Sequence, residues 1–504
     1  MNIYRAGSNH QPGSGSLPES QAQGFRLGVR VILALLAVCL ALASCTGSFD
    51  PLPWLQPGTA TPIGVRSATP IGVRSATPSS TSAGQSTLTP RPAQSSTPDA
   101  TIQSATPNGV RSVTPAQLTP DNKTPMGKSQ TLLIWVPPQF DPSNGTPGSD
   151  KLKARLAAFE NENPGLKVQV RVKGASGSGG LLESLSAASA AAPGTLPSLI
   201  ATSRSDLETA ALKGLVFPLD GMSRLVDDAD WYSYSRQLAL IQGTAFGLPF
   251  AGDSLLMLYR PAKLPTPPTD WPGLIKAALP ASFPAADNQS LLTLLLYLSA
   301  GGQVKDSQGR PTLQAEPLTQ VLRLYADGQK AGIFPNWLAQ YQTDGQAWQA
   351  YREQRTQLLI TWSSRYLIDL PADTSAVPIP SLGGQSLTLA TGWLWALVDP
   401  SADRRSAAVR LAEYLVNSDF LAQWSAATGY LPTRPSSLTG WSNQSLRALL
   451  SPVLLSSQVR PANDLLLGLG PILQEATLQI IKQQGDPAQT AQAAAERLSV
   501  PPSK

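Results

Sequence analysis

The chain of 504 residues is almost without histidine and cysteine, since it contains one histidine, His10, and two cysteines, Cys39 and Cys45. All three precede residue 46, so the long remainder of the chain has neither an imidazole nor a thiol. A Ser-His-Asp triad, a Cys-His dyad and a metal site of His or Cys ligands are therefore excluded there. Disulfide bonds are excluded as well. We expect no catalytic residue, no metal site and no cofactor in this part of the chain.

Most of the chain also has little excess charge. The net charge of +5 comes from the N-terminal part, because residues 1–45 carry +2 and residues 46–129 carry +3. Residues 130–504 are therefore neutral overall, although the whole chain is basic. A protein that binds nucleic acid concentrates positive charge on its folded part. We expect no nucleic-acid partner.

A short apolar run lies near the N-terminus and is preceded by Arg26 and Arg30. Residues 31–42 are nearly all Val, Leu, Ile and Ala, a run that suits a secretory signal but is too short for a permanent membrane span. The motif Leu42-Ala43-Ser44-Cys45 resembles the lipobox of bacterial lipoproteins. The resemblance implies a signal peptide at 1–45, lipidation at Cys45 and an extracytoplasmic protein that the lipid anchors to the bacterial cell membrane. An uncleaved N-terminal anchor is the alternative.

Residues 46–129 are dominated by Thr, Pro and Ser, and an eight-residue unit recurs at 60–67, 68–75 and, in altered form, at 105–112. So few large apolar side chains cannot offset the entropy lost on ordering, which predicts a disordered tether. A Pro-rich chain of this length would reach roughly 250 Å when fully extended. The Thr and Ser residues could carry O-glycans. A spacer with no role beyond its length is the alternative.

The folded part is expected at 130–504, where strand and helix patterns alternate. Strands are predicted at 131–136, 167–172 and 196–201, and helices at 151–161 and 181–192. This alternation is typical of a parallel α/β layer. The segment is too long for a single hydrophobic core, so two lobes are expected.

Several phrases of this segment occur in the order of a known family. They include Asn163-Pro164-Gly165, Phe-Gly-Leu-Pro-Phe at 246–250, Leu-Leu-Ile-Thr-Trp at 358–362, Gly392-Trp393 and Ala-Thr-Gly-Tyr-Leu-Pro-Thr-Arg at 427–434. Together they resemble the extracellular solute-binding proteins of the maltose and glycerol-phosphate type. The resemblance implies an α/β, two-lobed periplasmic-binding-protein-like fold with crossing hinge strands. It also implies that the lobes close on one small solute and deliver it to the permease subunits of an ABC importer.

The resemblance also divides the folded part into lobes. Lobe 1 is expected at about 130–248 and 396–445, and lobe 2 at about 252–390 and 446–500. The hinge strands would cross near 248–253 and 389–397, with a third crossing before the C-terminal helices. Ligand contacts made by both lobes would exist only when the cleft is shut, so the solute would shift the population toward the closed form.

Three candidate ligand-binding residues lie at or near these crossings. Asp253 follows the Gly-Leu-Pro crossing, where its carboxylate could accept hydrogen bonds from a polyol. A helix cap or turn cap is the alternative for Asp253. Trp362 ends an apolar strand, where the family often stacks an aromatic ring on a sugar, and Trp393 follows Gly392 at a crossing. Core packing is the alternative for both tryptophans.

Four further candidates come from other segments. Ser203 and Arg204 follow a predicted strand, and parallel sheets bind ligands beyond the carboxyl ends of their strands. Arg204 could bind a pair of hydroxyls, a carboxylate or a phosphate. Asn288, beside Gln289, corresponds to a position on the opposite lobe. Tyr430 is the last candidate, and clamping the end of its helix is the alternative.

The chain also departs from the sugar-binding pattern. Residues 463–470 contain no aromatic residue where maltose-type members carry one, and residues 137–140 lack their charged groups. These departures leave a short or less polar solute as open as an oligosaccharide. A surface-anchored sensor or adhesin remains an alternative function. A hydrolase would need two carboxylates facing each other across the cleft, and no Asp or Glu pair in a suggestive context is present. The sequence predicts a non-enzymatic protein that binds a sugar or a related polar solute.

Overall fold

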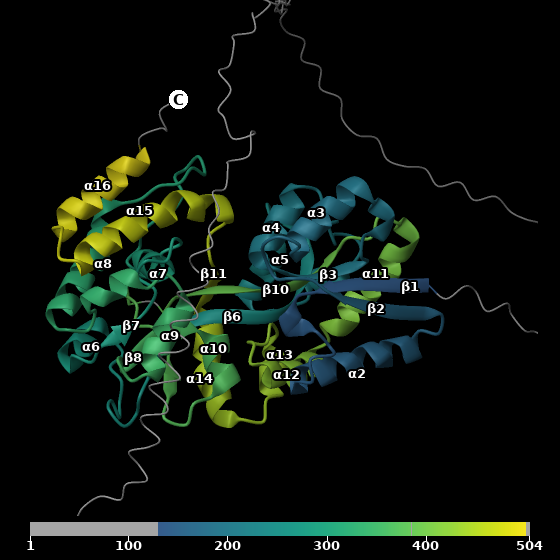
Figure 1. Cartoon of the computed structure of the whole chain (residues 1–504), viewed down its shortest axis with the longest axis horizontal. Helices are drawn as coiled ribbons and strands as arrows, with labels where there is room; N and C mark the ends of the chain where they lie inside the picture. The colour runs from purple at the N-terminus through teal and green to yellow at the C-terminus, as the bar shows by residue number, and fades with distance from the viewer. Residues whose placement is uncertain (1–129, 385, 500–504) are drawn as a thin grey trace, which may run out of the picture. The chain divides into compact units, whose positions relative to one another are not determined.

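The structure is a computed structural model that describes residues 130–384 and 386–499 (Figure 1). The predicted signal peptide 1–45, the predicted lipidation site Cys45 and the predicted tether 46–129 lie outside the described residues. Within the described part of the chain, no helix is both long and apolar enough to span a membrane.

A mixed sheet runs through the described part in the strand order β2-β1-β3-β10-β6-β8-β7, with β11 paired to β10 and β9 paired to β6. Its strands are β1 (Gln130–Val136), β2 (Leu166–Val172), β3 (Leu199–Ser203), β6 (Gly247–Tyr259), β7 (Ala281–Ser282), β8 (Leu358–Trp362), β9 (Ser375–Val377), β10 (Thr388–Leu397) and β11 (Ser457–Val459). A separate hairpin is formed by β4 (Leu240–Ile241) and β5 (Thr244–Ala245). β1 pairs in parallel with both β2 and β3, as the alternating pattern predicts.

Helices cover the two ends of this sheet. They are α2 (Pro147–Glu162), α3 (Leu181–Ala191), α4 (Arg204–Leu212), α5 (Ser233–Ala239), α6 (Trp271–Ala277), α7 (Leu291–Ser299), α8 (Ala315–Lys330), α9 (Asp344–Arg352), α10 (Ser363–Asp369), α11 (Ala402–Leu415), α12 (Ser418–Thr428), α13 (Pro435–Thr439), α14 (Gln444–Ser456), α15 (Asn463–Ile481) and α16 (Pro487–Ser499). In Figure 1, α2, α3, α11 and α12 lie around β1–β3, whereas α6, α7, α8, α15 and α16 lie around β7 and β8.

Each end of the sheet has its own hydrophobic core. One core joins β1 to α2, α11 and α12 through residues such as Ile134, Phe159 and Trp424. The other joins β8 to α7, α8 and α15 through residues such as Ile360 and Leu469. We call the first end lobe 1 and the second lobe 2. The two-lobed α/β fold predicted from the sequence is confirmed, while its exact residue limits stay predictions.

Two long antiparallel strands, β6 and β10, connect the lobes. The first half of β6 pairs with β10 in lobe 1, and its second half pairs with β8 in lobe 2. Gly252 of β6 lies opposite Gly392 of β10, and the register shifts just beyond, between Trp393 and Leu394. β11 makes a third crossing by pairing with the start of β10. These are the crossing hinge strands that the sequence predicts.

Strand directions bring two strand ends toward each other. β10 is antiparallel to β3 and to β6, and β6 is antiparallel to β8, so β3 and β8 run in opposite directions. Ser203, at the end of β3, pairs with Trp393, which in turn pairs with Ala251 of β6. Trp362, at the end of β8, pairs with Leu255 of β6. The two strand ends are therefore four residues apart along β6, or about 13 Å at ~3.3 Å per residue. The space between the strand ends is where this arrangement places a ligand.

Gly392→Ala is expected to lower the free energy of unfolding by about 1–3 kcal/mol, the usual cost of overpacking. A Cβ at Gly392 would lie 2.5 Å from the carbonyl oxygen of Ala251 and 2.6 Å from Cδ1 of Leu238. The carbonyl belongs to the neighbouring hinge strand and cannot rotate away. Urea unfolding measures the effect. Gly345→Ala in α9 is the control, because its nearest neighbour would be 3.9 Å away. Equal stability of the two variants would contradict the close hinge contact.

Candidate functional site

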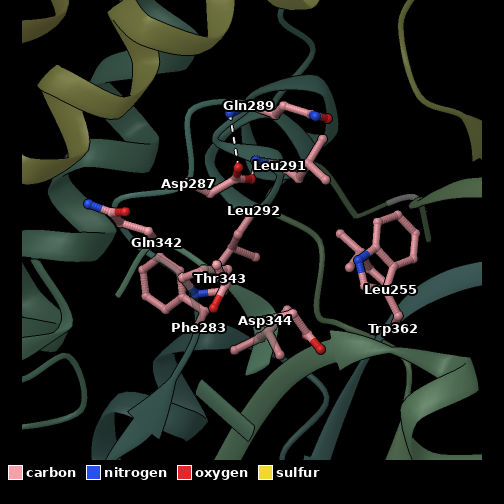
Figure 2. A pocket seen from close by; sticks show the side chains of 12 residues that line it. Leu255, Phe283, Asp287, Gln289, Leu291, Leu292, Gln342, Thr343, Asp344 and Trp362 are labelled. Carbon is pink, nitrogen blue, oxygen red and sulfur yellow. Dashed lines mark hydrogen bonds between the residues drawn. The ribbon is translucent and has the colours of Figure 1, made fainter. Parts of the chain in front are cut away.

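A cavity of about 300 Å³ lies on lobe 2 at the carboxyl end of β8 (Figure 2). We call it the Trp362 cavity, because the half-buried indole of Trp362 stands at one side of it. Its apolar lining comprises Leu255, Phe283, Pro284, Leu291, Leu292 and Ile360, and its polar lining comprises Asp287, Gln289, Gln342, Thr343 and Asp344. An apolar floor with a few polar groups around it is the usual construction of a small-molecule site.

Asp287 and Asp344 supply carboxylate oxygens to the Trp362 cavity, and local structure holds both. Asp287 precedes α7 and accepts hydrogen bonds from the backbone N–H groups of Gln289 (3.1 Å) and Leu291 (3.5 Å). Burial raises the pKa of Asp287. Asp344 begins α9 and accepts hydrogen bonds from Oγ1 of Thr361 (2.5 Å) and Nε of Arg365 (3.3 Å). Both carboxylates retain acceptor capacity for sugar hydroxyls.

A second hollow of about 230 Å³ adjoins the first, and we call it the α10 hollow. Asp344 and Trp362 line it together with Ser364, Arg365, Ile368 and Asp369 of α10. Trp362 and Asp344 therefore border both hollows. A solute larger than one ring could pass along Trp362 from one hollow into the other.

A third cavity, of about 320 Å³, lies between the lobes, and we call it the interlobe cavity. Its lining is Ser205 and Thr209 of α4, Asn288 and Gln289, Arg460 beyond β11, and Asn463, Leu466, Leu467 and Pro471 of α15. Gln289 also lines the Trp362 cavity, so this residue borders both cavities. Leu467 is 79% exposed and belongs to residues 463–470, which contain no aromatic residue. Polar groups from both lobes thus face one space.

The structure places some of the predicted site residues at these cavities and others elsewhere. Trp362 lines the Trp362 cavity, and the exposed Asn288 lines the interlobe cavity. Ser203 instead caps α4, since its Oγ accepts a hydrogen bond from the backbone N–H of Asp206 (3.1 Å). Arg204 turns back into lobe 1, where its guanidinium binds Glu208 (3.3 Å) and the carbonyl of Leu240 (3.3 Å).

Asp253 is buried at the crossing, with 9% of its surface exposed. Its carboxylate accepts three hydrogen bonds from the start of α10: from Oγ of Ser363 (2.7 Å), and from the backbone N–H (2.9 Å) and Oγ (2.6 Å) of Ser364. Burial raises the pKa of Asp253 to about 6, although these hydrogen bonds lower it. In this structure Asp253 acts as a cap for α10, which is the alternative that the sequence left open.

Trp393 and Tyr430 are half-buried and belong to an aromatic cluster of lobe 1. The ring of Trp393 meets Phe140 edge-on, with centroids 5.2 Å apart, and Tyr430 stacks on Trp424 at 6.4 Å. Burial raises the pKa of Tyr430. These contacts are those of core packing, the alternative stated for Trp393.

Sequence reasoning missed Asp287 and Asp344 in the Trp362 cavity and Arg460 in the interlobe cavity. Asp344 carries a local signal, because Thr343 and Gln346 form a capping box that marks the start of a helix. Arg460 follows the short strand β11 and carries no such signal.

Comparison with known proteins agrees with this geometry. Residues 154–447, more than half of the chain, match the family model described as bacterial extracellular solute-binding protein. A sugar-binding protein MalE from Xanthomonas citri is similar in structure, with 18% identity, a TM-score of 0.61 and coverage of 73% of this chain and 96% of that chain.

Two more solved structures are similar. The cyclic alpha-maltosyl-1,6-maltose binding protein from Arthrobacter globiformis has 16% identity, a TM-score of 0.60 and coverage of 73% of this chain and 98% of that chain. An ABC transporter solute-binding protein from Thermotoga lettingae, bound with alpha-D-tagatose, has 19% identity, a TM-score of 0.57 and coverage of 73% and 99%. These likenesses establish the two-lobed fold. None of the three is an enzyme by its description.

Among curated protein sequences, no match was found. The family model alone nevertheless spans both lobes, from α2 to α14. Its description as extracellular implies an extracytoplasmic location. The match agrees with the resemblance that the ordered phrases of the sequence suggest, and the chain belongs to the bacterial extracellular solute-binding proteins.

Proposed function

We propose that this protein is the solute-binding component of an ABC importer and that it captures a sugar or a related polar solute without converting it. The observation that carries the proposal is the grouping of Trp362 with Asp287 and Asp344 at the carboxyl end of β8. An aromatic ring covers the apolar face of a sugar, while carboxylates accept hydrogen bonds from its hydroxyls. The similar proteins from Xanthomonas citri, Arthrobacter globiformis and Thermotoga lettingae are described as binding sugars.

Capture requires that the solute favours one arrangement of the lobes. The interlobe cavity has polar groups from α4 on lobe 1 and from Asn288 and Gln289 on lobe 2. A solute that contacts both sets stabilises the closed arrangement, and only this difference in affinity can drive closure. The pairing of Gly252 with Gly392 leaves the hinge strands without side chains at one level of the crossing. The transmembrane permease subunits are the proposed partner of the closed form.

Membrane attachment is part of the same proposal. Lipidation at Cys45 would anchor the chain to the cell membrane, and residues 46–129 would hold the lobes away from the lipid surface. A composition rich in Pro, Thr and Ser supports this role, because it favours an extended chain. Among the residues predicted from the sequence, Asn288 and Trp362 are the ligand contacts that this proposal uses.

Thermal unfolding of the whole chain in detergent micelles, with a panel of sugars, polyols and amino acids, tests the proposal. A sugar that binds is expected to raise the melting temperature, since a hundredfold excess over the Kd adds about 2.7 kcal/mol of stability. Amino acids serve as polar controls that should give no shift. A panel in which no sugar or polyol shifts the transition would contradict sugar capture and favour the sensor or adhesin function.

A further inference from the structure

Arg460 differs from three arginines that are withdrawn from solvent and paired with a carboxylate. The paired ones are Arg204 with Glu208, Arg260 with Asp373 and Arg434 with Asp228. Arg460 is half-buried, yet within residues 130–384 and 386–499 no carboxylate oxygen lies within 4.0 Å of its guanidinium. Its Nη2 donates a hydrogen bond to Oδ1 of Asn463 (2.9 Å), which is uncharged. Burial lowers the pKa of Arg460. Removing a charge from water lowers the stability of the fold when no counter-ion lies beside it.

The two carboxylates whose charges act on Arg460, those of Glu208 and Asp206, do not fill this role. Glu208 binds Arg204 with one oxygen and the backbone N–H of Asn463 (2.9 Å) with the other. Burial raises the pKa of Asp206, which disfavours its charged form, although Arg460 and Oγ of Ser203 oppose the shift. Both carboxylates attract Arg460 at longer range without forming an ion pair. The counter-ion position next to the guanidinium is therefore open toward the interlobe cavity, which Arg460 lines.

The fold holds Arg460 rigidly at this place. Its backbone N–H donates to the carbonyl of Ala390 in β10 (3.0 Å), so it is fixed to a hinge strand. Asn463, its side-chain partner, is bound to lobe 1, because its Nδ2 donates to the carbonyl of Ser205 (2.9 Å) and its Oδ1 accepts from Oγ of Ser205 (3.2 Å). A planar guanidinium in a fixed position suits two-point binding of a carboxylate or a phosphate.

We propose that the solute is an acidic sugar, whose carboxylate or phosphate binds Arg460 in the interlobe cavity while its ring lies in the Trp362 cavity. The proposal rests on the proposed function and specifies its substrate class. Gln289 borders both cavities, so the proposal places the ring and the acidic group of one solute on either side of this residue. Among the described residues, the lining of the Trp362 cavity contains Asp287 and Asp344 but no Lys or Arg, so it repels the acidic end and sets the orientation.

Calorimetric titration of the whole chain tests the proposal with matched sets of probes: glucose, galactose and mannose, their uronic acids and their 6-phosphates. At least one acidic sugar is expected to bind ten times more tightly than its neutral parent. A uronic acid or a phosphate as the tighter probe identifies the acidic group. Arg460→Gln is expected to remove the preference, with a loss of thirtyfold or more for the acidic sugar and less than threefold for the neutral one.

Two further variants keep the test decisive. Arg460→Lys retains the positive charge without the planar guanidinium, so it should keep a weakened preference for the acidic sugar. This variant still tests the proposal if Arg460→Gln lowers the melting temperature. Arg323 is exposed on α8 and does not line any of the three cavities. Arg323→Gln therefore removes a charge outside the cavities and should leave the affinity for both acidic and neutral sugars unchanged. Neutral sugars that bind as tightly as their acids and phosphates would overturn this inference and leave the proposed function standing. Failure of every probe, neutral and acidic, would overturn both.

Discussion

Trp362→Ala is expected to weaken binding of the captured solute by about thirtyfold or more. Trp362 borders the Trp362 cavity and the α10 hollow, so a solute in either space contacts its ring. Truncation of a central aromatic anchor commonly costs ~2 kcal/mol or more, and each 1.4 kcal/mol is about tenfold in affinity. Titration calorimetry with the sugar that raises the melting temperature of the wild type measures the loss.

Two other variants separate the role of the ring from that of the fold. Trp362→Phe keeps an aromatic face and should lose less than about tenfold. Trp337→Ala is the matched control, since Trp337 is also half-buried but packs on Tyr341 with centroids 5.2 Å apart, outside the described cavities. Wild-type affinity in Trp362→Ala, or an equal loss in Trp337→Ala, would contradict a solute stacked on Trp362. Thermal unfolding of each variant without solute shows whether the fold is retained.

The strands of lobe 1 were largely predictable, because their apolar patterns are periodic. The strands expected at 131–136 and 167–172 are β1 (Gln130–Val136) and β2 (Leu166–Val172), each longer by one residue. The strand expected at 196–201 begins later, at Leu199. Pro197 has no N–H to donate to a sheet, which explains why the apolar run enters the strand only after it.

The candidate site was predictable only where a residue ends a recognisable strand. Trp362 ends such a strand and lines the Trp362 cavity, while its contact with a ligand stays a prediction. Arg204 also follows a strand, yet it turns away because Glu208 lies one helical turn further along α4 and pairs with it. The spacing of Arg204 and Glu208 is a sequence signal for such a pair. Arg460 was missed because its surroundings are assembled from distant segments, as Asn463 and Ser205, 258 residues apart, illustrate. Only the fold shows that no carboxylate within residues 130–384 and 386–499 pairs with Arg460.

Asp253→Asn is expected to change how stability depends on pH. The pKa of Asp253 is raised from 3.8 to about 6 by burial at the crossing, so the folded chain holds its proton more tightly than the unfolded chain does. A folded state that binds more protons loses stability as pH rises, here between about pH 4 and pH 6. At ~1.36 kcal/mol per pKa unit, the loss is roughly 3 kcal/mol. Asparagine has no proton to lose, so the variant should lack this loss.

Urea unfolding at pH 4 and pH 7 measures the free energy of unfolding of wild type and variant. The effects of the other titrating groups cancel in the difference between the two proteins. Asparagine can still accept from the backbone N–H of Ser364 and donate to its Oγ, so α10 should keep its cap. Asp306→Asn is the control of opposite sign. The backbone N–H and the side chain of Arg310 lower the pKa of Asp306, so its contribution to stability is present at neutral pH and is lost on acidification. If wild type and Asp253→Asn had the same pH dependence, Asp253 would ionise as an exposed carboxyl does. That result would contradict the effect expected from its burial between the hinge strand and α10.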